Sequence, residues 1–109
     1  MSGKRMTANE ICLMDATELA SAIRQKLLSP VEVVDAFLGN IDRLNPTLNA
    51  YCLVCEDDAR QAAQAAEAMV FAGGELGSLH GVPIAFKDMT PTKGIKTTFG
   101  SRICPSGRE

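Results

Sequence analysis

Hydrophobic residues recur every three or four positions along the first half of the chain, which is the spacing of amphipathic helices. The first stripe is apolar at every fourth residue: Leu19, Ile23 and Leu27. Asp15 lies just before it, and Glu18 follows Asp15 by three residues, as in a capping box. We therefore expect a helix that begins near Asp15, after a flexible N-terminus at residues 1–14.

A second helix has a more complete start signal. Ser29, Pro30 and Glu32 suit the N-cap, the first and the third helical positions, because the Ser29 hydroxyl can accept from the Glu32 amide while the Glu32 carboxylate accepts from the Ser29 amide. Its apolar face repeats at spacings of three and four: Val34, Phe37, Leu38, Ile41 and Leu44. Asn45-Pro46 is expected to end this helix, since a residue before proline avoids the helical region.

The rest of the chain alternates between β-rich and alanine-rich segments. LNAYCLVC, residues 48–55, is predicted to be a strand, and Val82–Phe86 a second apolar strand. Between them a helix is expected over residues 57–72, ended by Gly73-Gly74. Small residues form one face of it: Ala59, Ala62, Ala63, Ala66 and Val70. This order predicts an α/β fold, and because two or three strands rarely make a stable sheet alone, it indicates one end of a larger α/β domain.

Composition narrows the class of protein. A chain of 109 residues with 46% hydrophobic residues is enough for one domain. The net charge of −2 argues against nucleic acid or an anionic membrane as the dominant partner. No apolar run approaches the roughly 20 residues of a membrane span, and no signal peptide is evident. A cytoplasmic location with reduced cysteines is therefore expected.

No cofactor or metal is predicted. Cys52 and Cys55 form a single CxxC, whereas a structural zinc site needs four ligands, and residues three apart on a strand point to opposite faces. No phosphate-binding glycine loop is present. His80 is the only histidine, and it is assigned a turn or packing role because no nucleophile and acid lie near it in the sequence.

Lys87 is the candidate catalytic residue. It follows the apolar segment Val82–Phe86 directly, so it is either the solvated end of a strand or a base at the edge of a core. Lysine acts as a base at pH 7 when burial lowers its pKa by about three units, which corresponds to about 4 kcal/mol. The apolar side chains of Val82, Ile84 and Phe86 could supply that burial.

Several motifs in order resemble those of the amidase signature family. LHGVPIAFKDMTPTKGIKTTFGS, residues 79–101, is similar to the first signature block, which reads G-[VI]-P-I-x-x-K-D followed by T-x-G and TTxGS. Upstream, the S-P-x-E helix start, the L-N-A strand and the alanine-rich helix resemble the N-terminal region of the family. The resemblance covers residues 15–102. It implies that residues 15–109 are the N-terminal fragment of a domain with a mixed central sheet flanked by helices.

The resemblance also implies a chemistry. The family cleaves or transfers amide C–N bonds of small-molecule substrates through a Ser–cis-Ser–Lys triad, in which Lys87 would be the base and Asp88 would have a structural role. The glycine- and serine-rich block that carries both serines is absent from this sequence, and neither Ser101 nor Ser106 lies in such a block. A truncated gene product, a frameshift or an incomplete sequence would each explain this. The isolated chain is therefore expected to be inactive.

Two other functions stay open from the sequence. The first is the A subunit of a tRNA-dependent amidotransferase, although those subunits usually carry Asn where this chain has Met89, which favours a general amidase. The second is a non-enzymatic helical interaction module that recruits a partner through exposed helix faces. The oligomeric state is left open.

Overall fold

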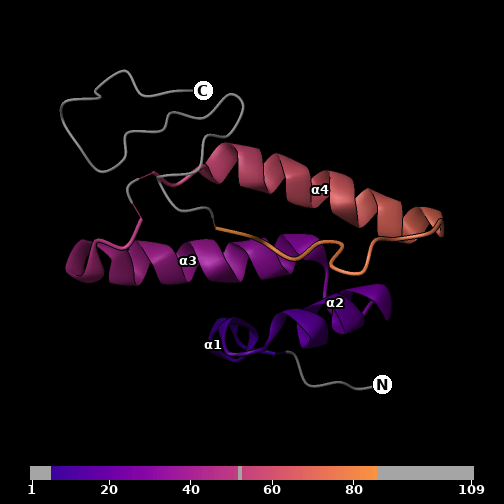
Figure 1. The fold of residues 1–109 in the computed structure, drawn as a ribbon, viewed down its shortest axis with the longest axis horizontal. Coiled ribbons are helices and arrows are strands. Elements are labelled where there is room, and N and C mark those ends of the chain that lie inside the picture. Colours follow the sequence, from indigo (N-terminus) through magenta and orange to yellow (C-terminus); the bar gives the residue numbers. More distant parts are fainter. Residues whose placement is uncertain (1–5, 52, 86–109) are drawn as a thin grey trace.

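Four helices make up the regular structure of the described part of the chain. A computed structural model describes residues 6–51 and 53–85. In chain order the helices are α1 (Ala8–Cys12), α2 (Ala16–Arg24), α3 (Pro30–Leu48) and α4 (Glu56–Ala72). Helices α3 and α4 lie alongside each other, and α1 and α2 lie on the other side of α3 (Figure 1). None of these helices is both long and apolar enough to cross a membrane.

The predicted capping boxes at the starts of α2 and α3 are both present. The Glu18 amide donates to Asp15 Oδ1 at 2.8 Å, and the Asp15 amide donates to Glu18 Oε1 at 2.9 Å. Ser29 and Glu32 exchange the same pair of bonds at 3.0 Å each. The hydrogen bond that the Glu18 amide donates to the Asp15 side chain holds the pKa of Asp15 below its ordinary value, because it stabilises the charged carboxylate.

Helix α1 was not anticipated, since it lies within the segment 1–14 for which no regular structure was predicted. Thr7 and Glu10 form a third capping box at its start. Ile11 is buried, which gives this short helix an apolar contact with the rest of the protein. A single turn of helix is marginal alone, so packing rather than propensity explains its presence.

The end of α2 changes which leucine is buried. Lys26 has a left-handed φ of 64°, its amide donates to Ile23 O at 3.0 Å, and the Leu27 amide donates to Ala22 O at 2.8 Å. This pair of bonds is a Schellman motif, which reverses the chain after the helix. The predicted stripe is therefore wrong at its last member: Leu27 is 71% exposed, and Leu28 is buried at 5%.

The prediction that Asn45-Pro46 ends the second helix is wrong. Helix α3 continues through Pro46 to Leu48 and ends at Asn49, which has a left-handed φ of 51°. Proline removes one helical N–H, and this loss falls in the last turn, where few bonds depend on it. The Asn45 side chain then holds the departing chain, since it accepts from the Tyr51 amide at 2.9 Å and donates to the Tyr51 carbonyl at 3.0 Å.

The two predicted strands are not seen in the described residues. Leu48 belongs to α3, and residues 49–51, 53–55 and 82–85 are irregular. A strand exists only when a neighbour supplies its hydrogen bonds, and the described residues contain no ladder for either segment. The α/β class is thus not visible in this part of the chain, which is helical.

Helix α4 matches its prediction closely. It begins at Glu56, one residue before the predicted start, and Gly73 ends it with a φ of 80°. Within the predicted small-residue face, Ala63 and Val70 are buried, while Ala62 is exposed. Ala63 packs against α3, and Val70 lies among buried side chains of α1, α2 and α3, so in the described residues this face packs against helices rather than a sheet.

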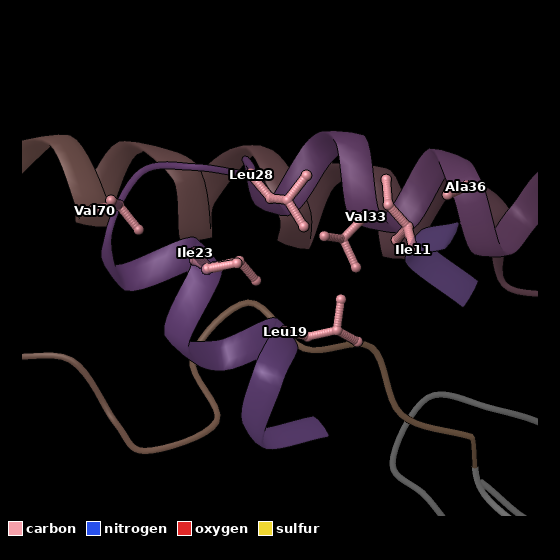
Figure 2. Close-up of a cluster of buried hydrophobic side chains, with 8 residues drawn as sticks. Ile11, Leu19, Ile23, Leu28, Val33, Ala36 and Val70 are labelled. Atoms are coloured by element: carbon pink, nitrogen blue, oxygen red, sulfur yellow. The ribbon is translucent and has the colours of Figure 1, made fainter. Parts of the chain in front are cut away.

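Helix α3 is buried on two faces. Its Val33 is fully buried in the larger apolar cluster, whose side chains converge from four elements of the structure (Figure 2). The neighbouring Val34, which lies about 100° around the helix axis from Val33, forms a second cluster with Leu38 and Ala63. The labelled members of the larger cluster are Ile11, Leu19, Ile23, Leu28, Val33, Ala36 and Val70.

The leucine pair at the end of α2 gives a direct test of this packing. We expect Leu28→Ala to lower the free energy of unfolding by about 2–4 kcal/mol, because it leaves a cavity in the larger cluster. The matched control is Leu27→Ala, which removes an exposed side chain and should change stability by less than about 0.5 kcal/mol. Urea unfolding followed by circular dichroism measures both. Equal losses for the two variants would contradict the packing described.

Candidate functional site

Lys87, the residue predicted from the sequence to be the base, lies outside the described residues, as do Asp88, Met89, Ser101 and Ser106. The described chain reaches Ala85, two positions before the lysine. The site can therefore be built from the segment that leads to Lys87. This segment begins with a turn at residues 77–82, here called the 77–82 turn.

Backbone hydrogen bonds shape the 77–82 turn and one side chain attaches it to α2. The His80 amide donates to Gly77 O, and the Val82 amide donates to Leu79 O, each at 3.1 Å. Arg24, at the end of α2, donates from Nη2 to the same Gly77 carbonyl at 3.4 Å. These two successive turns, together with the bond from Arg24 to Gly77, fix the path of the chain here.

His80 attaches the turn to α4. Its Nε2 lies 2.9 Å from the carbonyl oxygen of Ala66, in the middle of that helix. A carbonyl oxygen can only accept, so Nε2 carries the hydrogen and donates it. The side chain is half-buried, and the bond joins residues 14 positions apart. The turn or packing role predicted for His80 agrees with this contact.

The backbone of Gly81 lies in close contact with the core at the start of α3. It has a left-handed φ of 84°, and a Cβ added there would lie 3.0 Å from both Ile23 Cδ1 and Pro30 Cγ. Ile23 is 1% exposed and Pro30 is fully buried, so neither neighbour can move aside easily. Glycine is required at this position by both conformation and space.

The segment after Gly81 leaves the core. Val82 is partly buried against the larger apolar cluster, whereas Ile84 is 76% exposed. Phe86 lies outside the described residues. Of the apolar side chains that could bury Lys87, Val82 contributes to a core and Ile84 does not, within the described part of the chain.

The described cysteines show no reactive site. The Cys12 thiol donates to the Ala36 carbonyl at 3.5 Å, and burial raises its pKa, which keeps it protonated. Cys55 is half-buried and precedes α4 without a side-chain cap bond, while Cys52 lies outside the described residues. Within residues 6–51 and 53–85, no three histidine, cysteine or acidic side chains gather as a metal site.

An open groove of about 450 Å³ lies between α1 and α3. Cys12 and Ala36 form part of its wall, and Asp35 and Arg43 add charge. Asp35 is already paired with Arg60 of α4, and Arg43 donates to Asn40 at 2.8 Å, so both charged groups of the wall already have a partner. The groove is thus a junction between helices.

Sequence reasoning missed the contact that Gly81 makes with the core. No role was predicted for Gly81 beyond its place in the G-[VI]-P-I motif, and the residues that Gly81 touches are more than fifty positions earlier in the chain. The available signal was a glycine between a histidine and an apolar segment. That pattern suggests a close approach of the backbone without saying to what.

Comparison with known proteins places the chain in context. The family model described as Amidase matches residues 32–106. The A subunit of the glutamyl-tRNA(Gln) amidotransferase of Granulibacter bethesdensis is 51% identical over 86 residues, which are 79% of this chain and 17% of that protein. The acylamidase of Rhodococcus erythropolis is 35% identical over 97 residues, 89% of this chain and 20% of that protein.

The corresponding amidotransferase A subunit of Anaeromyxobacter dehalogenans is 42% identical over 96 residues, 88% of this chain and 20% of that protein. The chain thus spans about a fifth of the length of the curated relatives it matches. No solved structure matches it significantly.

The contact made by Gly81 predicts a large effect of one added methyl group. We expect Gly81→Ala to lower the free energy of unfolding by about 2–4 kcal/mol, from left-handed strain and overpacking against Ile23 and Pro30. Gly77→Ala is the control in the same turn, because nothing lies within 4 Å of a Cβ there. It should leave stability unchanged or raise it by up to about 1 kcal/mol. Thermal melts distinguish the two, and a Gly81→Ala protein as stable as the control would refute the contact.

Proposed function

The chain belongs to the amidase family, and on that premise we propose that it is the N-terminal part of an enzyme that cleaves amide C–N bonds. In this proposal Lys87 is the base of a Ser–cis-Ser–Lys triad, and the two serines belong to residues beyond this chain. The observation that carries the proposal is the family match over residues 32–106, which spans the G-V-P-I-A-F-K-D segment.

The chemistry assigned to each group follows from acyl transfer. A neutral Lys87 amine would take the proton of the bridging serine, which in turn takes the proton of the nucleophilic serine. The nucleophile attacks the amide carbonyl, the amine leaves with a proton, and water resolves the acyl-enzyme to the carboxylic acid. Lysine suits the role of base because burial shifts its pKa readily, whereas arginine stays charged.

A second candidate function is the amide-transferring subunit of a tRNA-dependent amidotransferase. It is favoured by the 51% identity to the A subunit of a glutamyl-tRNA(Gln) amidotransferase. Met89, in place of the usual Asn of those subunits, favours the general amidase. Ammonia release from simple amides by the full-length protein alone supports the amidase. Activity that appears only with a partner subunit and glutamylated tRNA supports the transferase.

The role of Lys87 is tested in the full-length protein that carries this segment. We expect Lys87→Ala to lower kcat on a simple amide by about 10²–10⁴-fold, the usual contribution of a general base. Lys87→Arg keeps the positive charge and cannot give up its proton, so it should lose as much. The control is Lys26→Ala, which removes an exposed lysine at the end of α2. Wild-type turnover in Lys87→Arg would show that the charge matters and that the base does not.

The isolated 109-residue chain supplies a separate prediction. We expect no amide turnover from it above the buffer rate, because a base without its nucleophile cannot form the acyl-enzyme. Release of ammonia from a panel of primary amides is the measurement. Turnover that is lost in the Lys87→Ala form of this chain would contradict the proposal that the nucleophile lies outside it.

A further inference from the structure

Helix α4 is apolar over a wider face than the described residues cover. At about 100° per residue, its apolar positions extend over roughly half of the circumference of the helix. One side of this sector is closed, because Ala63 and Val70 are buried and Ala59 packs against the second cluster. The residues of the other side are all exposed and are here called the outer face of α4: Ala62, Ala65, Met69 and Ala72.

The outer face lies at an edge of the described structure. Among the helices of the described chain, α3 is the one that runs alongside α4 (Figure 1). The four residues of the outer face lie within about 80° of one another around the axis, and Arg60 and Glu67 lie on the opposite side. The charged residue within the sector, Asp58, is in the first turn. Met69 is 52% exposed, so a large apolar side chain is left in solvent here.

The composition of the outer face favours a contact within one polypeptide over a contact between subunits. Alanine is depleted at interfaces between proteins, where aromatic residues, methionine and arginine are enriched. The outer face has three alanines to one methionine and contains no aromatic residue or arginine. It is also continuous with the α3–α4 interface, which is internal to this chain. Alanines leave room close to the helix, so a surface that covers them has to supply larger apolar side chains.

The length of the related proteins indicates which polypeptide covers this face. This chain spans about a fifth of the length of its curated relatives. The fraction of surface that folding buries rises with size, from roughly 68–70% at about 150 residues to about 75% at about 300 residues. A helix that is apolar over half of its circumference is therefore expected in the interior of a protein of that length.

We propose that the outer face of α4 is the docking surface for the polypeptide that follows residue 109 in the full-length protein. That polypeptide covers the alanines with larger apolar side chains, so that α4 has α3 on one side and the rest of the enzyme on the other. This inference rests on the proposed function for the existence of the longer polypeptide. It does not depend on the catalytic role of Lys87.

Cysteine accessibility in the full-length protein tests the docking surface. Ala65→Cys places a thiol on the outer face. The matched control is Gln64→Cys, because this neighbour lies about 100° away around the axis and both residues are exposed in the described structure. We expect iodoacetamide to modify the Ala65→Cys thiol at least about tenfold more slowly, because a covered thiol reacts only when the contact opens locally. Mass spectrometry of the modified peptide gives each rate, and thermal melts establish that both variants are folded.

Photo-cross-linking identifies what covers the outer face. Photo-methionine replaces Met69 by a diazirine side chain of nearly the same shape, so the packing is retained. The full-length protein is irradiated alone, with size-exclusion chromatography reporting its oligomeric state, and the cross-linked peptides are identified by mass spectrometry. We expect cross-links from position 69 to peptides that follow residue 109.

Each outcome decides the proposal separately from the chemistry. Equal modification of the two thiols in the full-length protein overturns it, as does protection that appears only with a second subunit or a second copy. Cross-links from position 69 to residues 86–109 alone also overturn it. If Ala65→Cys does not fold, the cross-links of the otherwise unsubstituted protein still decide. Protection of the Ala65→Cys thiol, with turnover retained in Lys87→Ala, supports the docking surface and removes the catalytic role of Lys87.

Discussion

The burial of α3 from two sides is the constraint on which the rest of the described structure depends. Val33 and Val34 are neighbours in the sequence and belong to different clusters. The first is shared with α1, α2 and Val70 of α4, and the second with Ala63 of α4. A helix that is apolar on both sides cannot lie at the edge of a protein without exposing one of them. Helix α3 therefore occupies the middle, and the other three helices pack around it.

The middle position of α3 also explains how the 77–82 turn is held. Pro30 begins α3 and is fully buried, and Ile23 lies beside it near the end of α2. Their junction forms the surface against which the Gly81 backbone rests. Helix α4, which contributes Ala63 and Val70 to the two clusters around α3, presents the Ala66 carbonyl to His80. The helical part thus acts as a frame for the segment that leads toward Lys87.

Structural features that depend on residues a few positions apart were predicted correctly from the sequence. The capping boxes at Asp15 and Ser29 need only partners three positions away, and the Gly73 end of α4 needs only the freedom of glycine. The predictions that failed depend on distant partners. The segment at residues 48–55 has β propensity but lacks a neighbouring strand in the described chain, and the Lys26 turn exposes Leu27 where strict periodicity would bury it.

By itself the sequence determined the positions of three helices, their caps and, through motif order, the amidase family that the comparison confirms. These features rest on short-range hydrogen bonds and on the order of residues along the chain. Only the tertiary structure decided that Leu28 rather than Leu27 is buried, that α3 has two buried faces, and that His80 and Gly81 tie the turn to three helices. Those outcomes depend on which surfaces meet, because the burial of a side chain is set by its neighbours in space.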